Sequence, residues 1–128
     1  MNQDEILNKK IGNIENEKLA EGKVTVVGVS IEPVVKKDTK VKIGDKVVFI
    51  CKHPDREEPL KISKVKYVKG ENIASSGIWY NEDKDGNIVK KSALADIMRF
   101  YRKEALSEFE GTEVQTKLDG EYLSIKAY

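Results

Sequence analysis

The chain has 128 residues, of which 39% are hydrophobic and 35% are charged. This length suits one domain with its own core. The single cysteine, Cys51, excludes an intramolecular disulfide and a cysteine-based zinc cluster. No apolar run approaches the roughly 20 residues of a membrane-spanning helix, and the polar start MNQDEILNKK has no signal core. We therefore expect a cytoplasmic protein that does not enter a membrane.

Charge is balanced over the whole chain but uneven along it. The net charge is +1, and lysine outnumbers arginine by 20 to 3, a lysine-rich usage that is typical of hyperthermophiles. Residues 34–69 and 89–103 carry net charges of +6 and +4, whereas residues 1–22, 70–88 and 104–128 carry −2, −3 and −4. The two basic segments would form one basic face if the fold brings them together. The alternative is ordinary solvated lysines.

The first part of the chain predicts a polar N-terminal arm or short helix over residues 1–22, followed by a single β-rich domain over residues 23–128. Residues 23–33 predict a strand, with Gly28 as a bulge or close approach and Pro33 as its end.

A tight turn at Gly44-Asp45 should introduce the next strand, whose run Val47 to Ile50 is apolar without a break. Such a run is typical of a strand buried on both faces. Residues 60–70 predict another strand with lysines in its middle, and residues 75–92 predict two short strands joined around Asp85-Gly86.

Residues 92–111 contain the clearest helix. Ser92 is a natural N-cap, and the helix carries an apolar stripe at helical spacing, made by Leu94, Ile97, Met98, Tyr101 and Leu106. The last residues predict a hairpin with Asp119-Gly120 as its turn. The sum is an α+β fold that is mostly β, a small curved sheet or OB-like barrel with one late α-helix.

The segment from Asn81 to Ser92 imitates a calcium-binding loop. Asn81, Asp83 and Asp85 alternate before Gly86, as ligand positions do in such loops. The glutamate that should close the loop is Ser92 instead, and the preceding residues are strand-like. A turn explains the same residues without a metal, because glycine accepts positive φ at little cost. We predict a turn and no metal or cofactor.

A Cys51–His53 pair would suit nucleophilic catalysis or metal binding. However, no second histidine or cysteine completes such a site, and Pro54 interrupts the strand before Asp55. We predict that Cys51 is a small buried hydrophobe, that His53 lies at a loop mouth, and that the protein is not an enzyme.

Aromatic residues near lysines are the most informative pattern, because single-strand binding on a β-surface needs rings that stack bases and cations that meet phosphates. The alternative is that the aromatic side chains belong to the core. The predicted nucleic-acid-binding residues are Lys64, Lys66, Tyr67, Lys69, Trp79 and Tyr80, with Lys90, Lys91, Arg99 and Arg102 extending the basic surface.

The last third of the chain carries a SALA helix, the closure LSEFEG and the terminal YLSIKAY. With these motifs it resembles the tails of small uncharacterised proteins from thermophilic archaea and their viruses and plasmids. The resemblance implies a protein that binds DNA or other proteins, and it carries over no functional residue.

These observations predict a non-enzymatic binding module. Its expected partner is single-stranded DNA or RNA, bound with little regard to sequence and with steep salt dependence. The competing hypothesis is a protein–protein or assembly module that uses exposed strand edges to meet a partner or a second copy as a homodimer.

Overall fold

The computed structural model describes Leu7 and residues 19–128, so most of the predicted N-terminal arm lies outside the described residues. The strands are β1 (Lys23–Val35), β2 (Lys42–Lys52), β3 (Leu60–Ile62), β4 (Lys64–Lys69), β5 (Asn72–Gly77), β6 (Trp79–Tyr80), β7 (Glu113–Asp119) and β8 (Tyr122–Ala127). The helix α3 (Ala93–Phe100) and the short 3-10 helix η1 (Leu106–Phe109) come between β6 and β7. The predicted mostly-β fold with one late helix is confirmed.

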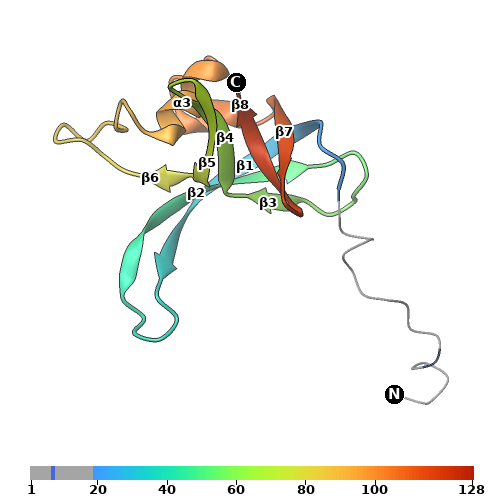
Figure 1. Cartoon of the computed structure of the whole chain (residues 1–128), viewed down its shortest axis with the longest axis horizontal. Coiled ribbons are helices and arrows are strands. Elements are labelled where there is room, and N and C mark those ends of the chain that lie inside the picture. The colour runs from blue at the N-terminus through green and yellow to red at the C-terminus, as the bar shows by residue number, and fades with distance from the viewer. Residues whose placement is uncertain (1–6, 8–18) are drawn as a thin grey trace.

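The strands form one strongly curved sheet, paired in the order β3-β2-β1-β7-β8-β4-β5, with β6 on β2 (Figure 1). The first strand of this path, β3, runs into β4 with only Ser63 between them. Ile78 links the bend between β3 and β4 to β2, because its N–H donates to the Ser63 carbonyl and its carbonyl accepts from Val47 N–H. The sheet therefore curls into a barrel-like shape around one core.

The β1–β2 hairpin extends beyond the rest of the sheet as an arm (Figure 1). A register shift beside Gly28 confirms the predicted bulge. The predicted end at Pro33 is wrong, since β1 continues to Val35. Proline is tolerated there because β7 pairs with β1 only at residues 23–25, so this edge needs no N–H donor.

The predicted Gly44-Asp45 turn is also wrong, because β2 runs through both residues. The chain turns at residues 36–41 instead, where Lys36 N–H donates to the Val41 carbonyl and Lys40 adopts a φ of 55°. Gly44 is needed for a different reason. A Cβ there would lie 3.3 Å from an indole carbon of Trp79, so glycine lets the ring pack closely on the strand.

The core lies inside the curved sheet and under α3. The central run of β2 is buried as predicted for Val47, Val48 and Phe49. The largest fully buried side chains are Phe49, Phe109, Ile62, Ile78, Leu94, Ile97 and Ile125. No helix within Leu7 and residues 19–128 is long and apolar enough to cross a membrane.

The calcium-like segment is a turn, as predicted. Asp83 Oδ1 accepts hydrogen bonds from the N–H groups of Asp85 (2.8 Å) and Asn87 (3.0 Å), and Gly86 has a φ of 80°. Of the two strands expected in residues 75–92, the first forms as the end of β5 and β6, and the second is reduced to an isolated bridge from Ile88 to Glu82. Ser92 is the N-cap of α3 and accepts from Ala95 N–H at 3.1 Å.

The helix is shorter than predicted. It ends at Phe100, and Arg102 then adopts the left-handed region with a φ of 58°. The chain resumes helical turns only in η1. Leu94, Ile97 and Met98 are buried, so the predicted apolar stripe is confirmed over the part that is helical.

Candidate nucleic-acid interface

The outward face of β4 and β8 carries a group of lysines. Val65 and Ile125 are fully buried and lie side by side in the parallel β4–β8 pair. Their neighbours along each strand must point outward, because side chains alternate across a sheet. Lys66 lies directly beside Lys126 in this register. Like charges at opposed positions repel, and the Lys126 ammonium lies over the Phe100 and Tyr128 rings and donates to the Tyr128 carbonyl.

Besides the pairs of Lys126 with Phe100 and Tyr128, two cation–aromatic pairs lie on this same face. The Lys64 ammonium is 5.6 Å from the centre of the Tyr122 ring, and the Lys46 ammonium is 5.0 Å from the centre of the Trp79 ring. Tyr122 is 68% exposed. Each pair leaves part of a π-system and a cation at the surface, which are the two groups that a single strand requires.

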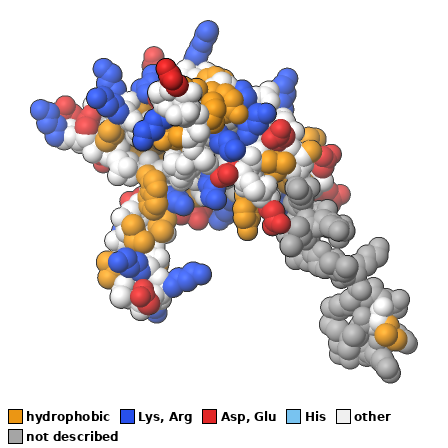
Figure 2. All heavy atoms as spheres, in the orientation of Figure 1, with side chains coloured by type: hydrophobic (Ala, Val, Ile, Leu, Met, Phe, Trp, Pro, Cys, Tyr) orange, Lys and Arg blue, Asp and Glu red, His pale blue; other side chains and the backbone are white. Residues whose placement is uncertain are grey.

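Gly77 lies close to both the Lys64–Tyr122 pair and the Lys46–Trp79 pair. It is the β5 partner of Lys64, and a Cβ at Gly77 would lie 2.8 Å from Lys46 Cε and 3.3 Å from Trp79 Nε1. A side chain would therefore displace the Lys46–Trp79 pair. We call the surface formed by Lys46, Lys64, Lys66, Trp79, Tyr122 and Lys126 the lysine–aromatic face. In Figure 2, lysine and arginine side chains lie between hydrophobic ones over β4, β5 and β8.

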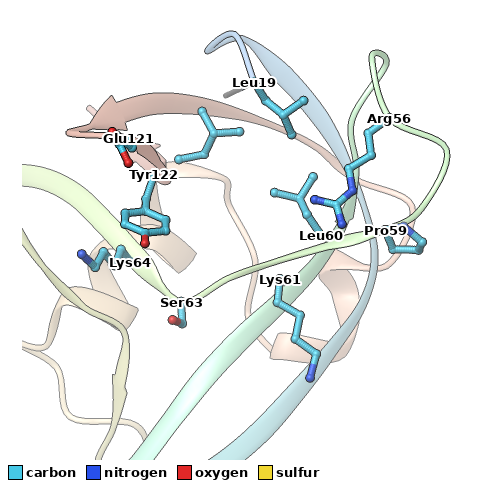
Figure 3. Close-up of a pocket in the computed structure, with 10 residues that line it drawn as sticks. Leu19, Arg56, Pro59, Leu60, Lys61, Ser63, Lys64, Glu121 and Tyr122 are labelled. Atoms are coloured by element: carbon cyan, nitrogen blue, oxygen red, sulfur yellow. The ribbon is translucent and has the colours of Figure 1, made fainter. Parts of the chain in front are cut away.

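A groove of about 700 Å³ adjoins this face, between the β3–β4 bend and the start of β8. Tyr122 and Lys64 form one wall, and Arg56 and Leu60 form the other (Figure 3). Its lining combines three cations, one ring, the carboxylate of Glu121 and apolar side chains from Leu19, Pro59, Leu60 and Leu123. The groove can therefore hold a planar apolar group next to negative charge.

Two of the predicted aromatic residues do not belong to the lysine–aromatic face. Tyr67 and Tyr80 are half-buried and pack against the core. Tyr67 follows Val65 on the inward side of β4, opposite to Lys64 and Lys66. Partial burial, followed by the charge of Glu82, raises the pKa of Tyr80. Lys69, at the end of β4, is exposed.

The structure places the other predicted basic residues on and beside α3, which packs against β4 and β8. Arg99 forms an ion pair with Asp96 and donates to the Lys90 carbonyl. Lys90 and Arg99 line a second groove of about 570 Å³. Lys91 and Arg102 are exposed at the two ends of the helix. These groups form a second basic region beside α3.

The Cys51–His53 segment is structural. Cys51 is fully buried, and desolvation raises the pKa of its thiol to about 12. His53 begins the loop after β2, and it is also buried. Its Nδ1 accepts from Asp55 N–H at 3.0 Å, which leaves Nε2 to donate to the Ala20 carbonyl at 2.8 Å. These hydrogen bonds tie Ala20 to the chain that follows β2.

Sequence reasoning missed Lys46, Tyr122 and Lys126. Alternation in the predicted hairpin gives the signal for Tyr122, since Leu123 and Ile125 on the opposite side fit a core. Lys46 has no such signal, because the β2–β6 pair that places it beside Trp79 joins residues more than 30 positions apart. Comparison with protein-family models, curated proteins and solved structures finds no match to this chain.

Proposed function

We propose that the protein binds single-stranded nucleic acid on the lysine–aromatic face, with little dependence on base sequence. The observation that carries the proposal is the placement of two rings, Trp79 and Tyr122, on one sheet face, each beside a lysine ammonium. Bases would stack on the rings and backbone phosphates would meet Lys64, Lys66 and Lys126.

The typical energies of stacking and of phosphate contacts support binding of a single strand by these groups. Stacking of a base on an aromatic side chain contributes about 1–3 kcal/mol and tolerates any base, because every base has a π-face. Lysine–phosphate contacts add affinity that falls with salt, since they release counterions. The curved sheet also agrees with an OB-like barrel, a fold in which the face of the second and third strands binds oligonucleotides. Here β2 and the bent β3–β4 segment occupy those places in chain order.

The test is fluorescence anisotropy with a labelled single strand of about 20 bases, at about 50 and 200 mM salt. We expect binding at the lower salt that weakens steeply at the higher. Tyr122→Ala should weaken binding about tenfold, because it removes one stacking ring. Its side chain is exposed, so the fold should remain. The matched control is Tyr67→Phe, which keeps the inward ring and should bind like the wild type.

Gly77→Ala gives a sharper version of the same test. It leaves every charge and ring in place, yet its Cβ would press on Lys46 and Trp79. Lys46 has a flexible end, so the fold should adapt by moving the ammonium away from the indole. Weaker binding by this variant would support the lysine–aromatic face. Wild-type protein that fails to bind even at the lower salt would contradict the proposal.

A second candidate function is assembly with another copy of the chain through the β1–β2 arm. The observation in its favour is a set of exposed β-branched side chains on the arm, made by Ile31, Val35, Val41 and Ile43. Exposed apolar surface of this kind marks protein contacts. Pro33 blocks hydrogen bonding at the free edge of β1, so the contact would use the face of the arm. The oligomeric state of the isolated chain tests this function.

A further inference from the structure

The outward side of β7 and β8 already holds one anionic group, the carboxylate of Glu21. Its Oε2 accepts from Leu118 N–H at 2.8 Å, and its Oε1 lies 3.5 Å from the Lys117 ammonium. The Leu118 hydrogen bond, and then the charges of Lys117 and Lys66, lower the pKa of Glu21 against the opposing effect of desolvation. This part of the surface therefore stabilises an oxyanion.

A buried hydroxyl lies next to this position. Ser124 is 0% exposed, and its Oγ has no hydrogen-bond partner among the described residues. Ser124 pairs with Lys117 across the β7–β8 hairpin. It also precedes Ile125, the partner of Val65, so Lys64 and Lys66 flank it on β4. Leu123 and Ile125 point into the core, so Ser124 points outward, among the lysines.

An unpartnered buried hydroxyl is costly, and most such groups in proteins are satisfied. The residues that flank Ser124 on β7 and β4 are lysines, whose ammonium groups move on flexible four-carbon stems. When these stems part, the hydroxyl can donate to an anion that the same lysines bind. An outward hydroxyl and flanking cations, two of which already interact with a carboxylate, are components of a phosphate site.

We propose that Ser124, Lys66 and Lys117 form a phosphate-binding site, and that the Glu21 carboxylate competes with phosphate for the two lysines. A phosphate brings more charge and more acceptor oxygens than a carboxylate. It can therefore accept from Ser124 Oγ while it meets both ammonium groups. The phosphate belongs to a nucleic-acid backbone or to a free phosphorylated molecule. Only the first source rests on the function proposed above.

The test is a titration of the full chain with inorganic phosphate, followed by NMR shifts of the β7 and β8 amides, with ionic strength held constant by chloride. Wild-type protein should show saturable shifts at Leu118 and Ser124. Ser124→Ala should weaken phosphate binding about tenfold, because a hydrogen bond to a charged group is lost. The hydroxyl has no partner among the described residues, so Ser124→Ala should not lower the melting temperature.

Glu21→Gln should change binding in the opposite direction. Removal of the competing charge should strengthen phosphate binding severalfold, and a glutamine oxygen can still accept from Leu118 N–H. The matched control is Glu32→Gln. Glu32 is also bonded to a lysine, Lys61, at 3.1 Å, but it lies on β1. Both variants change the net charge equally, so an effect of Glu21→Gln alone shows local competition.

A single strand of about 20 bases, added as a competitor, identifies the source of the phosphate. If it displaces phosphate, and an uncharged methylphosphonate strand does not, the site binds nucleic-acid backbone. If phosphate binds the wild type and the strand does not compete, the site binds free phosphate and the nucleic-acid function loses support. Amide shifts that do not saturate in either the wild type or Glu21→Gln would overturn the proposal. Phosphate binding by Ser124→Ala that is as tight as that of the wild type would also overturn it, even if single strands bind.

Discussion

At the scale of single residues, the side of the strand decides what each group does. Lys66 and Tyr67 are neighbours in sequence, but Lys66 points outward beside Lys126, whereas Tyr67 packs against the core. The same rule separates Trp79, which contacts Lys46 on the outward side, from Tyr80, which packs inward. Residues that are close together in the sequence are thus divided between the outward surface of the sheet and the core.

Cys51 gives a prediction at this scale. The side chain is fully buried, and desolvation raises the pKa of the thiol to about 12. Both effects make the reactive thiolate scarce. At a pH of about 8, a thiol reagent should therefore modify native protein only as fast as the chain opens, and unfolded protein at once. Rapid modification of native protein, measured by mass spectrometry, would show that Cys51 is accessible.

At the scale of elements, the long β1–β2 hairpin is the most distinctive feature. Its base is part of the barrel-like sheet, where β2 pairs with β1 on one side and with β3 and β6 on the other. Its outer part pairs only within the hairpin, so side chains that would be core elsewhere remain exposed. Local turn chemistry did not predict this length, because Gly44 serves the packing of Trp79 and not a turn.

If the arm mediates assembly, Ile43→Glu should abolish it. The substitution places a charge among exposed apolar side chains, so it should leave the fold intact and disfavour burial of the arm in a contact. Sedimentation velocity should then show a dimer for the wild type and a monomer for the variant. Lys84→Glu, in the exposed 81–87 turn, is the control. A wild type that stays monomeric at high concentration would contradict the assembly function.

At the scale of the whole molecule, the fold distributes charge differently from the sequence. The basic segment 34–69 is divided between the arm, the lysine–aromatic face and ion pairs such as Lys61–Glu32. The basic segment 89–103 lies around α3. Lys117 and Lys126, from an acidic segment, join the face of Lys64 and Lys66. Net charge by segment therefore does not predict which lysines share a surface.

The carboxylates that oppose these lysines should make stability depend on pH. Hydrogen bonds from Leu118 to Glu21, and from Lys61 and Ser30 to Glu32, lower the pKa of each carboxyl in the folded chain. A lowered folded pKa contributes stability that is complete above the unfolded value and is lost as the pH falls through the folded value. Each contribution is small because both groups are exposed to solvent.

The comparison uses Glu21→Gln/Glu32→Gln against the wild type. The wild type should have the higher melting temperature at neutral pH, and this difference should shrink as the pH falls below the ordinary glutamate range. Circular dichroism melts across this range measure the difference. A difference in melting temperature that stays constant as the pH falls into the acid range would show that the two carboxylates do not stabilise the fold through their charge.

The sequence by itself determined the features that depend on neighbours along the chain. Alternation and apolar runs predicted the buried centre of β2, Gly28 the bulge, Asp85-Gly86 and Asp119-Gly120 the turns, and Ser92 the helix cap. These are local, because backbone hydrogen bonds and side-chain direction within a few residues decide them.

Tertiary structure alone decided the candidate sites. The β2–β6, β4–β5 and β4–β8 pairings bring Lys46, Trp79, Lys64 and Tyr122 onto one face, and the path of the chain before β1 brings Glu21 to Lys117. Strand pairing between distant segments depends on how all the apolar faces are buried together. No short stretch of sequence contains that information, so the lysine–aromatic face and the Ser124 site emerge only in the folded chain.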